Sequence, residues 1–213
     1  VFADDSSGTG YAEVFRQVRA NFQFAAAPHS GKVFAMTSSE PGEGKTTLLT
    51  NLGVALVLNG KRVVVVDSDL RRPMVHKMYA VKNQQGLSTL LSEPGTPIAG
   101  VIAEAIVGGN TISVIPSGPI PPNPAELLGS QNMRDLLERL RGEYDFVLMD
   151  SPPVGAVSDS MVIASQADGV LLVAVLGESK GRALRESLKR LENANAVVLG
   201  VLFNKVRQSR MRY

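Results

Sequence analysis

The segment 38–47, Ser-Ser-Glu-Pro-Gly-Glu-Gly-Lys-Thr-Thr, constrains the fold of this chain more than any other. An apolar run at residues 33–36 precedes it, and a helical pattern over residues 48–58 follows it. A strand, a glycine-bearing turn and a helix that opens on Lys-Thr form the layout of a phosphate-binding loop. We therefore expect a nucleotide phosphate here, and the plainer alternative is a tight turn with an exposed lysine.

Each residue type in this loop has a physical role at a phosphate. Gly42 and Gly44 allow a sharp turn and a close approach of the backbone. The amides of the loop then point at the anion, at the positive end of the following helix. Lys45 can reach the outer phosphates, and the hydroxyl of Thr46 can hold Mg²⁺. The first glycine of the G-x-x-x-x-G-K-[ST] pattern is Ser39 here, so the match is imperfect.

Strand and helix patterns alternate along the rest of the chain. Residues 63–66 are four consecutive valines, which is typical of a strand buried on both faces of a parallel sheet. Further strands are expected at 32–37, 112–115, 146–149, 170–175 and 197–203, and helices at 11–24, from 73 onward, 86–91, 98–106, 125–141 and 180–191. The alternation predicts an α/β fold with a mostly parallel central sheet and helices on both faces.

Length and charge suggest one domain with a short extension at each end. The 213 residues suffice for one core. We expect a flexible lead-in over residues 1–10, the domain over 11–204 and a basic tail over 205–213. The tail carries Lys205, Arg207, Arg210 and Arg212 and no acid, so the remainder of this chain of net charge +2 is slightly acidic. Such a tail fits a solvated terminus or contact with an acidic surface.

Several function classes are disfavoured by composition. The chain has no cysteine, which excludes a disulfide framework, thiolate metal sites and a cysteine nucleophile. An aromatic content of 5% gives little basis for base stacking, so we expect no nucleic-acid partner. No signal peptide and no apolar run of roughly 20 residues is present, as a membrane span would need. The chain begins with Val1, and we expect it to be a piece of a longer protein.

Aspartates stand directly after two of the apolar strand patterns. Asp67 and Asp69 follow the valine run, and Asp150 follows the apolar run 146–149. Ligands of open α/β sheets lie at the carboxyl ends of the strands, where the phosphate loop also lies. Mg²⁺ prefers oxygen ligands and keeps several waters. Thr46, Asp150 and two phosphate oxygens would meet that need.

The pair Asp67 and Asp69 precedes two arginines, Arg71 and Arg72. One carboxylate can accept the proton of an attacking hydroxyl, and an arginine can offset charge on a transferring phosphoryl group. The plainer alternative is a helix N-cap, or a surface pair worth about 1 kcal/mol or less.

Other titratable residues give weaker evidence of a functional role. Asp159 is expected to cap a helix that starts at Ser160, and Asp168 to lie in a turn before Gly169. The histidines stand alone, without the spacing of metal ligands.

Taken together, these motifs resemble those of the bacterial tyrosine kinases of capsule and exopolysaccharide export, which are relatives of the MinD/ParA ATPases with a P-loop fold. The matching segments are 38–47 (Walker A), 63–69 (Walker A′), 146–153 (Walker B), the E-x-x-R-x-x-R pattern of Glu13, Arg16 and Arg19, the segment 69–73, and the proline loop and helix 122–128. The resemblance spans residues 11–204.

The resemblance implies a role for each matching residue. ATP would be bound by Gly42, Glu43, Gly44, Lys45, Thr46, Thr47 and Asn204, with Thr47 at the α-phosphate and Asn204 at the adenine. Mg²⁺ would be held by Thr46, Asp67 and Asp150. Catalytic roles fall to Lys45, Asp67, Asp69 and Arg71, with Asp67 as the base for the tyrosine hydroxyl.

The activity implied is an ATP-dependent protein-tyrosine kinase that phosphorylates its own C-terminal tyrosines and regulates polysaccharide polymerisation and export. It would form a ring of copies through Glu13, Arg16 and Arg19. A membrane adaptor or activator, fused or separate, would hold it in the cytoplasm at the inner face of the membrane. Protein tyrosines would be its substrates.

Two departures from the related families bear on this interpretation. The signature lysine of the MinD/ParA ATPases would fall at Glu40. The usual C-terminal tyrosine cluster is represented only by Tyr213, so either the cluster lies beyond this chain or phosphorylation differs. The alternatives are a MinD/ParA-like regulatory ATPase without kinase activity, and an adaptor whose nucleotide only sets its assembly state.

Overall fold

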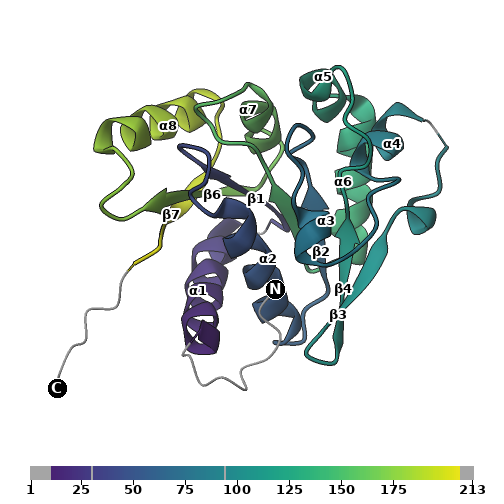
Figure 1. Cartoon of the computed structure of the whole chain (residues 1–213), viewed down its shortest axis with the longest axis horizontal. Coiled ribbons are helices and arrows are strands. Elements are labelled where there is room, and N and C mark those ends of the chain that lie inside the picture. The colour runs from purple at the N-terminus through teal and green to yellow at the C-terminus, as the bar shows by residue number, and fades with distance from the viewer. Residues whose placement is uncertain (1–10, 30, 94, 207–213) are drawn as a thin grey trace.

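The computed structural model describes residues 11–29, 31–93 and 95–206 and places a seven-stranded sheet at the centre of the molecule (Figure 1). The strand order is β3-β4-β2-β5-β1-β6-β7, and every neighbouring pair is parallel except β3 and β4. The strands are β1 (Val33–Ser38), β2 (Val63–Asp67), β3 (Ala103–Val107), β4 (Asn110–Ile115), β5 (Phe146–Asp150), β6 (Gly169–Val175) and β7 (Val198–Asn204). The expected mostly parallel α/β fold is confirmed.

Helices cover both faces of the sheet, as Figure 1 shows. One face packs against α1 (Tyr11–Ala26), α2 (Lys45–Val57) and α3 (Val75–Met78). The other packs against α4 (Leu87–Ser92), α5 (Pro124–Leu128), α6 (Gln131–Glu143), α7 (Asp159–Ala164) and α8 (Gly181–Asn193). The valines of β2 alternate between the two cores, with Val63 and Val65 in the first and Val64 and Val66 in the second. None of the helices in the described part of the chain is long and apolar enough to span a membrane.

Two helices were predicted wrongly, and the first of them is the segment 98–106. In the segment 98–106, only Ile98–Gly100 is helical, as a 3-10 turn, and β3 follows as the antiparallel edge strand of a hairpin with β4. Burial in β3 alternates along the strand, with Glu104 and Ile106 exposed, so the relevant period was two. The hairpin turn needs positive φ at Gly108 and Gly109.

The expected single helix over residues 125–141 is divided into α5 and α6. The break falls at Gly129 and Ser130, and the hydroxyl of Ser130 accepts a hydrogen bond from the backbone N–H of Met133 at 3.3 Å. A serine at this position satisfies one of the free N–H groups that begin a helix, so α6 starts anew there.

Two aspartates have larger roles than expected. Helix α7 begins at Asp159 itself, so the expected capping of a helix at Ser160 was wrong, and the carboxylate is fully buried against Arg71. Asp168 does lie in the bend before β6. Its carboxylate also accepts from Arg141 and from the backbone N–H groups of Lys32 and Val33, and these contacts lower its pKa against the effect of burial.

Candidate functional site

The phosphate loop has the backbone geometry that its glycines predict. Gly42 and Gly44 have φ angles of 82° and 90°, in the left-handed region where other residues are strained. A Cβ on Gly44 would also lie 2.2 Å from the side-chain nitrogen of Asn204. Ser39, in contrast, has no positive φ. A serine therefore fits at the first glycine position of the motif without backbone strain.

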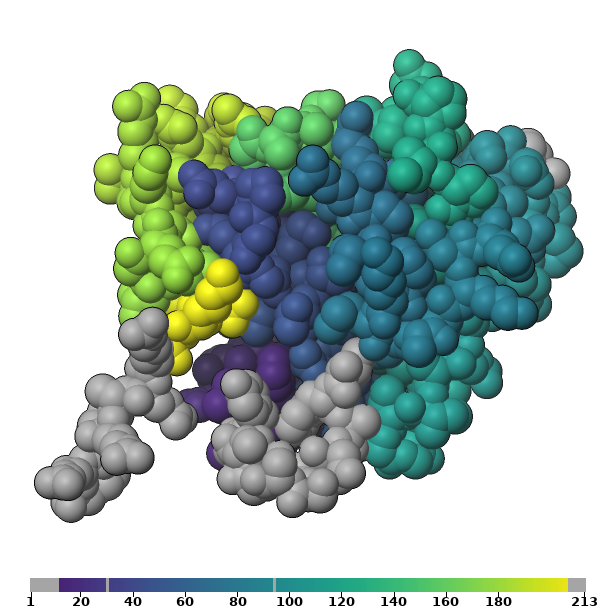
Figure 2. Space-filling view, in the orientation of Figure 1, coloured from purple at the N-terminus to yellow at the C-terminus, as the bar shows by residue number. Residues whose placement is uncertain are grey.

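Glu43 fixes the shape of this loop from inside the protein. Its side chain is buried, and its carboxylate accepts from the backbone N–H of Glu40 at 3.0 Å and from the hydroxyl of Ser179. Its backbone carbonyl accepts from the side chain of Asn204 at 2.9 Å. Figure 2 shows the end of β7, in yellow, against the dark blue of this region. Because the Glu43 side chain points into these contacts, its backbone is the part available to a phosphate.

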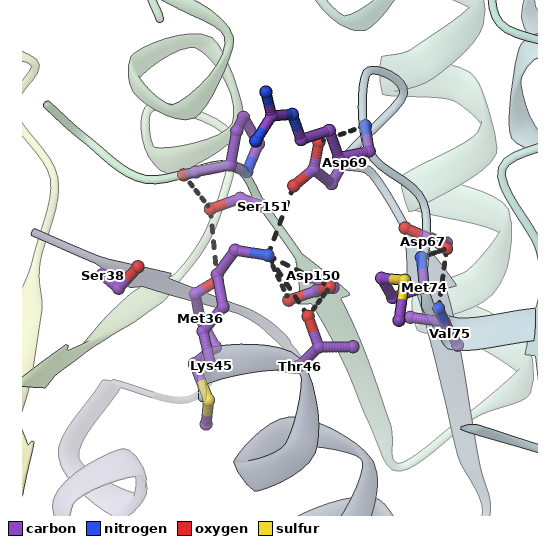
Figure 3. Close-up of polar contacts among 12 residues, drawn as sticks. Met36, Ser38, Lys45, Thr46, Asp67, Asp69, Met74, Val75, Asp150 and Ser151 are labelled. Carbon is purple, nitrogen blue, oxygen red and sulfur yellow. Dashed lines mark hydrogen bonds and ion pairs between the residues drawn. The ribbon is translucent and has the colours of Figure 1, made fainter. Parts of the chain in front are cut away.

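Four polar side chains, from the start of α2, the loop after β2 and the end of β5, meet beside the phosphate loop (Figure 3). The Lys45 ammonium lies 3.3 Å from a carboxylate oxygen of Asp69 and 3.4 Å from one of Asp150. The Thr46 hydroxyl donates to Asp150 at 2.6 Å. Parallel pairing of β1, β2 and β5 brings these ends together at one edge of the sheet. The expected grouping of Lys45, Thr46, Asp69 and Asp150 is what the structure contains.

Asp67 lies at the same edge but faces α3. One carboxylate oxygen accepts from the backbone N–H groups of Met74 and Val75, at 3.1 and 2.9 Å. The other oxygen, Oδ1, is buried and has no hydrogen-bond partner among the described residues. A buried polar atom without a partner is uncommon in folded proteins, and this oxygen is therefore free to bind a ligand or to accept a proton.

The electrostatics of the cluster follow from burial of three carboxylates beside one cation. Burial, with the charges of Asp150 and Asp69, raises the pKa of Asp67 to about 8. Burial also raises the pKa of Asp150 to about 6, although Lys45 and Thr46 oppose the change. Burial alone would lower the pKa of Lys45, but the carboxylates of Asp150 and Asp69 outweigh it and raise that pKa. The cluster therefore carries an excess of negative charge that a further cation would relieve.

The residues fit a bound Mg²⁺. Thr46, Asp150 and the free oxygen of Asp67 are hard oxygen donors, and Mg²⁺ prefers such donors together with waters and phosphate oxygens. No group of three or more acidic or histidine side chains forms a complete metal cage within the described ranges. A magnesium ion that is bound partly through a nucleotide needs no such cage.

A cleft of about 570 Å³ opens over this cluster. Its polar lining includes residues of the phosphate loop with Lys45, Thr46, Thr47 and Asp69. Its apolar walls include Met74, Met78, Pro152 and Pro153. The volume suits a nucleotide together with part of a second substrate.

The two arginines after Asp69 differ in their contacts. The Arg71 guanidinium donates two hydrogen bonds to the buried carboxylate of Asp159, at 2.7 and 3.1 Å. Arg72 offers its backbone N–H to Asp69 at 3.0 Å, and no side-chain partner is recorded for it in the described chain. Both line the cleft. The pairing of Arg71 with Asp159 was not foreseen, since 88 residues separate them and no local pattern links them.

Comparison with known proteins places the chain in a family. The sequence pattern of the AAA domain matches residues 31–195. Tyrosine-protein kinase YwqD of Bacillus subtilis is 35% identical over 195 residues, which cover 91% of this chain and 80% of that protein. The chain belongs to the bacterial tyrosine kinase family, within the P-loop superfamily. The solved kinase domain of the Escherichia coli tyrosine kinase ETK is 32% identical with a TM-score of 0.90, over 99% of this chain and 82% of that one.

Other members of the bacterial tyrosine kinase family are longer. Tyrosine-protein kinase etk of Escherichia coli K12 is 34% identical over 204 residues, which are 96% of this chain but 28% of that protein. MinD of Pyrococcus horikoshii, solved with Mg-ADP, is 23% identical with a TM-score of 0.68 over 84% of this chain and 72% of that one. This last similarity concerns the fold alone. The expected kinase family and the expected MinD-like fold are confirmed.

Proposed function

We propose that this domain is an ATP·Mg²⁺-dependent protein-tyrosine kinase. The observation that carries the proposal is the set of three buried aspartates at the strand ends beside Lys45 of the phosphate loop, in a chain of this family. The tyrosine hydroxyl attacks the γ-phosphorus, a new P–O bond forms to tyrosine, and the P–O bond to the ADP leaving group breaks.

Each residue of the site has its own role in this reaction. Lys45 and the loop amides bind the phosphates, and Thr47 and Asn204 are assigned to the α-phosphate and adenine. Thr46 and Asp150 would hold Mg²⁺, with Asp67 and Asp69 beside it, and the ion would offset the phosphate charge when bound. Asp67 accepts the tyrosine proton at Oδ1, the carboxylate oxygen that has no partner in the described chain.

Two features refine the catalytic assignments. Asp67 does not line the cleft, whereas Met74, whose N–H it binds, does. We infer that the segment 71–75 moves when tyrosine binds, so that the hydroxyl reaches Asp67. Arg71 would offset charge on the transferring phosphoryl group while it stays paired with Asp159. This pairing holds its guanidinium in one position.

The proposal predicts phosphotyrosine in the chain itself. Incubation with ATP and Mg²⁺, followed by peptide mass spectrometry, is expected to find phosphate on Tyr213, which lies outside the described residues. Tyr79 is expected to stay unmodified because it is buried and its hydroxyl donates to the carbonyl of Thr50. The variant Lys45→Met is the control. Phosphate release without phosphotyrosine would favour the regulatory ATPase.

The regulatory ATPase of the MinD/ParA type is the second candidate. In that class a lysine near the start of the phosphate loop reaches the partner's nucleotide, and this chain has Glu40 there. A carboxylate at that position repels phosphates. This observation favours the kinase.

We further propose a ring of copies joined through α1. Glu13 and Arg16 form an exposed pair at 2.8 Å, whereas Arg19 folds onto α2 and donates to the carbonyl of Ala55 at 3.3 Å. Of the three expected ring residues, Glu13 and Arg16 are therefore the ones on the surface. A membrane adaptor, fused or separate, would hold this ring at the cytoplasmic face, where it would regulate polysaccharide polymerisation and export.

Charge reversal tests the ring. Arg16→Glu is expected to shift a large assembly toward smaller species, because it places a second carboxylate beside Glu13. Light scattering of the intact chain measures the mass. Arg139→Glu is the matched control, since Arg139 has a similar exposure of 57% and also pairs within its own helix. An unchanged mass for Arg16→Glu would remove the ring from the proposal.

A further inference from the structure

A second cavity, of about 270 Å³, adjoins the nucleotide cleft. It lies between the phosphate loop, the segment after β5 and helix α8, and Pro41 and Ala156 line both spaces. A group in this cavity would therefore sit next to whatever enters the cleft. None of the assigned nucleotide or magnesium residues lines it.

Ser39 presents an unpaired hydroxyl at this cavity. The residue is 3% exposed, and its side-chain oxygen is buried with no hydrogen-bond partner among the residues that the structure describes. A Cβ on Gly155 would lie 2.8 Å from the carbonyl oxygen of Ser39, so the segment after β5 packs directly on the loop here. Leaving a buried hydroxyl without a partner costs free energy, which a ligand with a donor group would recover.

One carboxylate that lines the cavity is unpaired in the described chain and would attract a cation. Glu40 is exposed, and its carboxylate has no recorded hydrogen bond or ion pair in the described chain. Glu186 accepts from Arg182 at 2.8 Å. Arg190 is the opposing charge, and its guanidinium donates to the carbonyl of Val154 at 3.2 Å. Because Glu186 is already paired with Arg182, Glu40 is the lining carboxylate without a partner in the described chain.

We propose that this cavity binds the side chain of an arginine that lies next to the acceptor tyrosine, presented by a second copy of the chain. A guanidinium has five N–H donors in a planar fork, enough to serve both the Glu40 carboxylate and the Ser39 hydroxyl. The chain's own segment 205–213 ends in Arg210-Met211-Arg212-Tyr213 and contains no acid. This inference rests on the proposed kinase function and names the acceptor that it prefers.

The test measures binding apart from phosphoryl transfer. Two peptides with the sequence of residues 205–213 carry phenylalanine in place of Tyr213, and one of them also carries glutamine at 210 and 212. Each is titrated by fluorescence anisotropy into the full chain with Mg²⁺ and a non-hydrolysable ATP analogue. The arginine peptide is expected to bind about tenfold more tightly than the glutamine peptide.

Single substitutions test which residues of the cavity cause the preference for the arginine peptide. Glu40→Gln is expected to bring the ratio of the two affinities close to one, and Ser39→Ala to reduce it while leaving the fold intact, because it removes an unpaired hydroxyl. Glu104→Gln, at an exposed glutamate on β3, is the matched control and should keep the full ratio. Equal binding of both peptides by the unmodified chain, or a ratio unchanged in Glu40→Gln, would overturn the proposal.

The same variants separate this inference from the kinase function. With the corresponding tyrosine peptides and ATP, phosphotyrosine formed equally on both would leave the kinase function standing and refute the subsite. A preference that depends on Glu40 without any phosphotyrosine would support the subsite and refute the kinase function.

Discussion

Replacing Asp67 by asparagine is expected to lower tyrosine phosphorylation about 10²- to 10⁴-fold, the usual contribution of a general base. The amide cannot take the tyrosine proton. Its oxygen can still accept from the backbone N–H groups of Met74 and Val75, so the loop before α3 should keep its shape. ATP affinity should therefore change much less than the rate. Single-turnover phosphorylation and ATP titration measure the two quantities.

The same variant is expected to be more stable than the unmodified protein at pH 8 when metal and nucleotide are absent. The folded-state pKa of Asp67, about 8, lies above the ordinary carboxyl value of 3.8. Between these values the folded state binds more protons than the unfolded state, so stability falls as pH rises from about 4 to 8. An amide does not ionise and escapes this loss.

Thermal unfolding in EDTA at several pH values measures this effect. We expect Asp67→Asn to gain roughly 1–3 kcal/mol at pH 8 and little near pH 4. Asp135→Asn, at an exposed aspartate on α6, controls for the loss of one charge. Near-normal phosphorylation by Asp67→Asn would exclude it as the base, and a loss of stability at pH 8 would contradict the raised pKa.

Replacing Lys45 by methionine is expected to weaken ATP binding by roughly 10²- to 10³-fold, because truncating one member of a buried charge pair costs about 2–5 kcal/mol. The Lys45 side chain is only 13% exposed, and without nucleotide its ammonium is held by Asp69 and Asp150. On nucleotide binding we expect it to turn to the phosphates. Its charge thus has a partner in both states.

Calorimetric titration of Lys45→Met with ATP and Mg²⁺ measures the loss. Lys61→Met, at an exposed lysine beyond the far end of α2, is the matched control. The variant should remain folded, because the pKa of Asp150, already raised to about 6, can rise further and let the carboxyl take up a proton. An affinity for ATP equal to that of Lys61→Met would contradict the role of Lys45.

The central sheet and the main cluster were predictable because their signals are local. The apolar runs define β1, β2 and β5, and the residues that end these strands necessarily meet at one edge of a parallel sheet. The pairing of Arg71 with Asp159, and of Glu43 with Ser179, could not be predicted in this way. Each joins segments far apart in the sequence, and their contact depends on how those segments pack.

The errors in the predicted helices have a different cause. The edge strand β3 has one buried face, and exposed Glu104 and Ile106 alternate with buried residues. The apolar residues of this segment also fit the pattern of a short helix, which is why a helix was predicted. For α5 and α6, the serine cap at Ser130 lies within an otherwise continuous helical pattern. Both signals were present in the sequence but were weaker than the pattern around them.

The hydrogen bond from Asn204 to the carbonyl of Glu43 bears on how this domain can be shortened. The last residue of the edge strand β7 supports the phosphate loop, which lies 161 positions earlier in the chain. A fragment that stops before Asn204 would leave the core in place and still lose the support under its nucleotide site. Boundaries chosen for expression or for fusion to a partner should therefore keep β7 to its final residue.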